Sequence, residues 1–244
     1  MRELTVAKDR PVAISGVADA IGRLKGHRDV YIAGHWRALL PDDLLWGDRN
    51  MSSGPGIHRG KEIYERPKDF QAPSWSWISV DGHVSWNASE KNPPLVWELL
   101  NYSVTLANER APFGAVQEAE LEIRASVLDI VAKIDIATGK PYPPTNDATE
   151  MMEKCLELWA DCLPSPGEKE PTKLTLALAR GRVSYFGANF GTSWGLVLQE
   201  VQVCSEMIET PRYRRWGIFR SIRTADNGID DWFKSWACKE FRLI

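Results

Sequence analysis

Two histidines that lie among aromatic side chains are the residues best suited to chemistry in this sequence. His35 lies between Tyr31 and Trp36, and His83 lies in the tryptophan-rich stretch 71–86. A neutral imidazole beside an apolar wall can donate a hydrogen bond to a carbonyl or move a proton near neutral pH. We therefore predict His35 and His83 as the candidate catalytic residues. The structural alternative is a buried histidine that is hydrogen-bonded within the core.

The tryptophan-rich stretch itself, QAPSWSWISVDGHVSW at 71–86, provides the aromatic surface that a pocket would need. Its Asp-Gly pair favours a two-residue type I′ hairpin turn, which requires positive φ angles. Such a hairpin pairs Trp77 with Trp86 and places Trp75 on the same face, because side chains alternate along a strand. The spacing leaves open whether this face packs into the core or lines a cavity for an apolar ligand.

The predicted substrate-binding residues combine a large apolar surface with one polar atom. Tryptophan is abundant, with 11 residues in 244, which favours either a thick-walled apolar pocket or an aromatic core. The stretch 47–70 is rich in Gly, Pro, Ser and charge and is expected to form a long loop that serves as a lid. The predicted wall and lid residues are Trp36, Tyr64, Trp75, Trp77 and Trp86.

The sequence contains no recognisable motif for a nucleotide or a metal ion. FGANFGTSWG at 186–195 spaces its glycines unlike a dinucleotide fingerprint, and there is no Walker loop. No two histidines are separated by two or four positions, and C-x-x-C does not occur. The four cysteines are too few and too widely spaced for a disulfide framework. We therefore expect no metal and no cofactor.

Charge and hydropathy narrow the range of partners. A net charge of -3 argues against an electrostatic hold on nucleic acid or on an anionic membrane. No run approaches the roughly 20 apolar residues of a membrane span, and the N-terminus lacks the apolar segment of a signal peptide. The basic RYRRWG at 212–217 is interpreted as a solvated strand edge in preference to a phosphate clamp. We expect a cytoplasmic protein that binds an apolar small molecule, and the oligomeric state is left open.

Periodicity predicts an α+β fold that is predominantly antiparallel β, as a barrel or a sandwich. Apolar residues at helical spacing predict an N-terminal helix over 10–25 and one further helix over 147–163. We expect one domain over 1–244, with a helical N-terminal segment over 1–46 and a β-rich body over 73–244. The predicted strands of this body are 95–107, 119–136, 172–186, 194–204, 213–223 and 236–244.

Several phrases of the chain resemble fungal heterokaryon-incompatibility (HET) proteins. YIAGHWRALLPDDLLW and RPKDFQAPSWSWISVDGHVSW are similar to the region that follows the HET domain proper, and RYRRWGIF and FRLI are similar to its β-rich remainder. The Toll/interleukin-receptor-like half of that family would lie upstream of Leu4, so the resemblance implies a stand-alone C-terminal region without the effector half. His35 and His83 replace residues that are usually apolar or proline in this pattern, which favours a new role for them.

These observations lead to two expected functions. The first is a cofactor-independent cyclase that performs a pericyclic [4+2] reaction of the Diels–Alder type on an apolar fungal secondary metabolite. Such a reaction needs only a pocket that holds diene and dienophile in a near-attack geometry, with a donor to the activating carbonyl. The alternative is a non-catalytic interaction or regulatory module of heterokaryon-incompatibility signalling.

Overall fold

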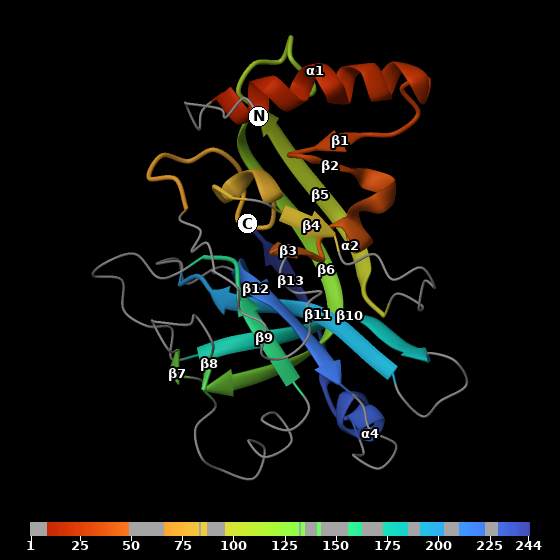
Figure 1. Cartoon of the computed structure of the whole chain (residues 1–244), viewed down its shortest axis with the longest axis vertical. Helices are drawn as coiled ribbons and strands as arrows, with labels where there is room; N and C mark the ends of the chain where they lie inside the picture. The colour runs from red at the N-terminus through yellow and green to blue at the C-terminus, as the bar shows by residue number, and fades with distance from the viewer. Residues whose placement is uncertain are drawn as a thin grey trace.

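A closed β-barrel lies beneath a small N-terminal layer in the computed structural model of the chain (Figure 1). Helix α1 (Asp9–Leu24) lies at the top of this layer, and the short helix α4 (Ile229–Lys234) lies at the opposite end of the molecule. The residues that the structure describes are 9–48, 66–82, 84–86, 96–131, 133–134, 141–142, 156–162, 173–184, 191–202, 210–222 and 229–244.

Seven strands form the main sheet: β5 (Glu98–Leu106), β6 (Val116–Val131), β9 (Leu156–Ala160), β10 (Lys173–Ser184), β11 (Gly191–Glu200), β12 (Arg212–Ile222) and β13 (Ala237–Leu243). The strands β10, β11, β12, β13 and β6 follow one another, and β10 also pairs with β6, which closes a five-stranded barrel. Only β12 and β13 pair in parallel among these neighbours. The predicted α+β fold with a mainly antiparallel β body is confirmed.

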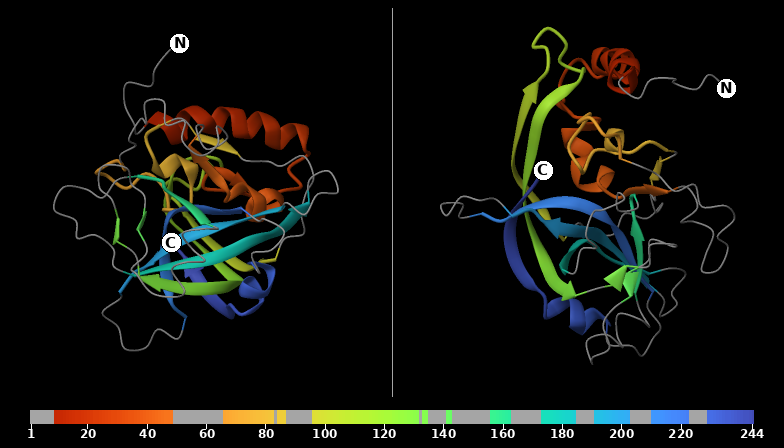
Figure 2. Two further views of the ribbon diagram at one scale, coloured as in Figure 1. Left: turned by 60° about the horizontal axis from the view of Figure 1, so that its bottom comes forward. Right: turned by 90° about the vertical axis from the view of Figure 1, so that its left-hand side faces the viewer.

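Strand β6 joins the barrel to the N-terminal layer. Its residues alternate between buried Ala119, Leu121 and Ile123 and the charged residues between them, as expected for a strand with one face on the core. Its first part pairs with β5, and the two strands extend beyond the barrel, where α1 lies beside their tip (Figure 2). A Cβ atom on Gly22 of α1 would lie 2.9 Å from the ring of Phe113 at that tip, so the helix packs closely there.

The N-terminal layer is built from very short elements. After α1 come β1 (Tyr31–Ile32), β2 (His35–Trp36), the 3-10 helix Arg37–Leu39, α2 (Leu40–Asp43) and β3 (Trp46–Asp48). Farther along the chain it is completed by the 3-10 helix Trp77–Ser79 and by β4 (Val84–Trp86). A separate two-stranded pairing joins β7 (Lys133–Ile134) to β8 (Pro141–Tyr142).

One buried cluster spans both the N-terminal layer and the barrel. Ile32, Leu44 and Trp75 of the layer belong to the same cluster as Leu121 and Leu196 of the barrel. A second cluster lies where α4 and β9 cover the barrel strands. Because the first cluster is continuous, the layer is held on the barrel by apolar burial.

Each of the six strands predicted beyond residue 95 overlaps an observed strand. The predicted helix over 147–163 is wrong for its last part, because residues 156–160 form strand β9. The alternating burial of Leu156 and Leu158 fits a strand, and β9 pairs with β12 at Gly217, where a Cβ atom would lie only 1.9 Å from the backbone oxygen of Trp159. Residues 147–155 lie outside the described residues.

The predicted tryptophan hairpin is also wrong. Residues 77–79 form a 3-10 helix, whose N-cap Ser76 accepts a hydrogen bond from the backbone of Ile78. Strand β4 pairs with β3 instead, so that Trp86 lies opposite Trp46 and not opposite Trp77. The predicted loop 47–70 begins inside β3, and residues 49–65 lie outside the described residues.

Candidate functional site

The Trp-Ser-Trp phrase holds a tight turn in the YIAGHW segment. Ala33 and Gly34 connect β1 to β2 with φ angles of 45° and 101°, which is the two-residue turn geometry that the sequence suggested for Asp-Gly. Ser76 Oγ donates to the Ala33 carbonyl at 2.6 Å, and Trp77 Nε1 donates to the Gly34 carbonyl at 2.9 Å. The two segments with predicted site residues therefore do meet, and they meet through a structural turn.

His35, a predicted catalytic residue, lies in the core. Its side chain is 0% exposed, and neither ring nitrogen has a hydrogen-bond partner within 3.5 Å among the described residues. Its Nδ1 lies 3.7 Å from Asp43 Oδ2, and its ring centroid is 5.7 Å from that of the fully buried Trp75. Burial lowers the pKa of His35, because the charged form would be desolvated.

The other predicted pocket residues fall into separate places. Trp36 packs against Tyr31 and Phe113, whose ring also lies close to Gly22 of α1. Trp77 and Trp86 contact each other edge to face with ring centroids 6.2 Å apart, and Trp86 is 43% exposed. Tyr64 and His83 lie outside the described residues. None of the described predicted residues is part of the lining of the cavity described below, and their catalytic and binding roles stay predictions.

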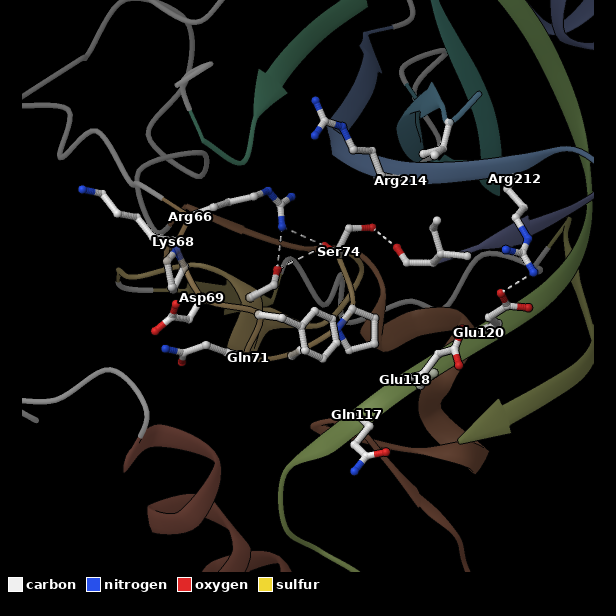
Figure 3. A pocket seen from close by; sticks show the side chains of 18 residues that line it. Arg66, Lys68, Asp69, Gln71, Ser74, Gln117, Glu118, Glu120, Arg212 and Arg214 are labelled. Carbon is white, nitrogen blue, oxygen red and sulfur yellow. Dashed lines mark hydrogen bonds and ion pairs between the residues drawn. The ribbon is translucent and has the colours of Figure 1, made fainter. Parts of the chain in front are cut away.

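A different cavity, of about 510 Å³, lies between the stretch 66–74 and the adjoining ends of barrel strands (Figure 3). Its apolar lining includes Phe70, Pro73, Val201 and Ile244, and β6 contributes Ala119. Polar side chains from the same stretch and from strands β6 and β12 complete the wall. These labelled polar residues are Arg66, Lys68, Asp69, Gln71, Ser74, Gln117, Glu118, Glu120, Arg212 and Arg214.

Ser74 and Arg66 fix the stretch 66–74 against the barrel. The backbone N–H of Ser74 donates to the backbone oxygen of Ile244 at 3.2 Å, and Ser74 Oγ accepts from the N–H of Arg215 at 2.8 Å. Arg66 donates to Ser79 Oγ at 2.8 Å and to the Arg215 carbonyl at 2.9 Å. This wall of the cavity is therefore built from hydrogen bonds between segments that are far apart in sequence.

A buried ion pair, formed by Arg215 and Asp161, lies behind this wall. The fully buried Arg215 guanidinium donates to Asp161 Oδ1 at 2.8 Å and to the carbonyls of Leu44 and Trp46 at 2.8 and 2.6 Å. Its Cζ also lies 3.5 Å from the centroid of the Trp46 ring, a cation–π geometry. Asp161 Oδ2 lies 3.6 Å from Arg66, so the buried ion pair connects the cavity wall with the N-terminal layer.

The alternation of β12 sends its arginines to two sides. Arg212 and Arg214 line the cavity. Arg215 points to the other side of the strand and is buried between the barrel and the N-terminal layer. The sequence reading of RYRRWG as a solvated edge missed this arrangement. The spacing of Arg212 and Arg214 already places their side chains on the same face of a strand. The stretch 66–74 that covers them has no helical or strand periodicity, so the sequence gives no sign that it packs there.

The described residues contain no candidate metal site and no candidate membrane span. No group of three or more His, Cys, Asp or Glu side chains in this part of the chain could hold a metal ion. No helix formed by the described residues has the length and apolar character needed to cross a membrane. Comparison with protein-family models, with curated proteins and with solved structures finds no match to this chain. The resemblance to HET proteins therefore stays a prediction.

Proposed function

We propose that this protein is a cofactor-independent cyclase that performs a [4+2] reaction of the Diels–Alder type on a largely apolar fungal metabolite. The cavity of about 510 Å³ is the observation that supports this proposal most strongly. Its volume lies within the usual range of small-molecule sites, and it combines an apolar wall with a small number of polar groups.

The reaction makes modest demands on the protein. The diene and the dienophile form two carbon–carbon bonds while three π bonds become one, so that no atom leaves and no oxidant, reductant or base is consumed. The protein contributes by holding the two reacting parts of one substrate in a near-attack geometry. The apolar residues Phe70, Pro73 and Val201 would enclose the hydrocarbon part of the substrate.

Arg66 is our candidate for the group that polarises the activating carbonyl. It lines the cavity, is half-buried, and is held in place by hydrogen bonds to Ser79 and to the backbone of Arg215. A fixed positive charge stabilises the negative charge that develops on a carbonyl oxygen in the transition state. In this proposal Arg66 takes the role that the sequence suggested for His35 or His83, because His35 lies in the core.

The test uses a synthetic substrate in which an aliphatic chain joins a diene to an α,β-unsaturated aldehyde. Cyclisation is followed by chiral chromatography, and we expect the protein to accelerate it and to favour one enantiomer. Arg66→Met should lower the rate by about 100-fold, the usual effect of losing one such group, whereas Arg66→Lys should retain more activity. The proposal would be refuted if the substrate binds but cyclises no faster than in buffer and gives a racemic product.

One observation favours the alternative, a non-catalytic interaction module. Helix α1 exposes four large apolar side chains, namely Val12, Val17, Ile21 and Leu24. Exposed apolar surface of this kind often marks a contact with another protein. Under this alternative, a separately expressed HET domain would bind the chain in a pull-down experiment, Val17→Asp with Ile21→Asp would abolish that binding, and no cyclisation would be seen.

A further inference from the structure

The cavity carries more positive than negative charge on the part of its wall that is shielded from solvent. Its lining contains four cationic side chains and three carboxylates: Arg66, Lys68, Arg212 and Arg214 against Asp69, Glu118 and Glu120. Lys68, Asp69 and Glu118 are exposed at the rim, whereas the three arginines and Glu120 are half-buried. The half-buried wall therefore combines three positive charges with one negative charge.

The carboxylates next to this wall each face two guanidinium groups. Glu120 lies 2.9 Å from Arg212 and 3.6 Å from Arg242. Asp161 likewise faces two guanidinium groups, because it pairs with Arg215 and also lies 3.6 Å from Arg66. Neither carboxylate can neutralise both of its neighbours, so the described wall keeps a net positive charge that would attract an anion.

Arg212 has a donor that the described residues leave unused. Its terminal nitrogen makes the contact with Glu120, and its Nε, which is shielded from solvent, has no hydrogen-bond partner among the described residues. A buried donor without a partner is costly, and a donor with positive charge is costlier still. The planar guanidinium is matched best by a carboxylate, which can accept two parallel hydrogen bonds. Figure 3 shows Arg212 extending toward Glu120, while Arg214 extends away from both.

The remainder of the lining is apolar and would suit a hydrocarbon chain or ring system. Pro73 and Ala72 are buried at the back of the cavity, and Val201 and Ile244 are half-buried beside them. Phe70 is 60% exposed at the rim, where a ligand could cover it. One cavity thus offers an apolar surface and a cationic wall.

We propose that the ligand of this cavity is an amphipathic carboxylate. Its carboxylate group binds the guanidinium of Arg212, and its apolar body lies against Phe70, Pro73 and Val201. This inference rests on the proposed function in one respect, namely that the substrate occupies this cavity. It adds the chemical class of the substrate, an organic acid with a large hydrocarbon part.

The test compares two probes that differ only in their head group, decanoate and decanol, by isothermal titration calorimetry with the full chain at pH 7.5. We expect decanoate to bind at least about tenfold more tightly, in line with one charge-assisted hydrogen bond. The difference should shrink in 0.5 M NaCl, since salt screens partly exposed charges. Arg212→Gln should reduce decanoate binding to the level of decanol, and Arg212→Lys should give an intermediate affinity.

Lys173→Gln on β10 is the matched control, because it removes one exposed positive charge outside the cavity and should leave both affinities unchanged. Thermal unfolding of each variant checks that the fold is retained. Equal affinity for the two probes would overturn the carboxylate inference while leaving the cavity as a binding site. Failure of both probes to bind would count against the proposed function as well. A preference for decanoate that survives Arg212→Gln would overturn the assignment to Arg212.

Discussion

The stretch 66–79 lies between two regions of different character, one packed with tryptophan side chains and one that borders a cavity lined by arginines. On one side, Trp75 is fully buried and the Trp77 indole donates a hydrogen bond to the β1–β2 turn. On the other side, Arg66 and Ser74 border a cavity of about 510 Å³. The tryptophan-rich side is closed and aromatic, and the arginine-lined side is open and charged.

This difference shows what the tryptophans contribute. Strands β1 and β2 have two residues each, and such short elements gain little stability from their own hydrogen bonds. Large aromatic side chains supply the buried area that holds them together. In this molecule, aromatic enrichment therefore marks a core, whereas the half-buried arginines beside an apolar surface line the cavity that we propose as the binding site.

The largest expected effect separates the two regions directly. Trp75→Ala should lower the free energy of unfolding by about 3–5 kcal/mol, because it empties a fully buried aromatic position. Phe70→Ala at the cavity rim should lower it by less than about 0.5 kcal/mol, since Phe70 is largely exposed, but should weaken ligand binding. Urea unfolding and calorimetric titration on both variants provide the comparison. A Trp75→Ala variant with unchanged stability would show that Trp75 is not a core residue.

A second pair of variants tests adjacent arginines on the two sides of β12. Arg215→Met should lower the free energy of unfolding by about 3 kcal/mol, because it leaves Asp161 buried without its arginine. We place this value at the lower end of the usual range because Arg66 lies 3.6 Å from the same carboxylate. Arg214→Met should cost less than about 1 kcal/mol, since Arg214 is only half-buried. Similar urea midpoints for the two variants would contradict the expectation that the buried Arg215 contributes more to stability than the half-buried Arg214.

Most of the fold could be predicted from the sequence, and the reasons for the exceptions are local. Strand β6 shows period-two alternation of burial from Ala119 to Val127, so the prediction of its central part needed no tertiary information. Residues 156–160 carry an apolar pattern, LELWA, that fits a helix or a strand equally over so short a length. These residues form a strand because they pair with β12, and that pairing requires a glycine at position 217, where a side chain would collide with the backbone of Trp159.

The site was harder to predict for a different reason. The cavity lies between residues that are more than 100 positions apart, such as Arg66 and Arg212, and no spacing in the sequence reports such a contact. The histidine hypothesis started from aromatic neighbours, which are as common around a core residue as around a pocket. A sequence feature that could have helped is the pair of arginines at period two in β12, since charged side chains there had to find partners.

A third prediction concerns the turn that the Trp-Ser-Trp phrase holds. Gly34 has a φ angle of 101°, and a Cβ atom there would lie 2.9 Å from Trp77 Nε1 and 3.0 Å from Ile78. Gly34→Ala should therefore lower the free energy of unfolding by about 2 kcal/mol. Gly16→Ala is the matched control, because nothing lies within 4 Å of a Cβ atom at that position in helix α1. It should raise stability by about 0.5–1 kcal/mol. Equal effects of the two substitutions would show that the turn tolerates a side chain.

The smallest expected effect is a pH dependence on the tryptophan-rich side. Burial lowers the pKa of His35 in the folded protein, so the unfolded chain binds a proton at His35 at a higher pH than the folded chain does. Stability contributed by the neutral imidazole is therefore fully present above the unfolded pKa of about 6.5 and is lost as the pH falls toward the lowered folded value. His35→Leu should make the free energy of unfolding less dependent on pH below about 6.5, relative to the unmodified protein. Urea titrations at a series of pH values measure this slope. If both proteins lose stability in parallel, His35 is protonated equally in the folded and unfolded chains, and the tryptophan-rich side is more open to water than its burial indicates.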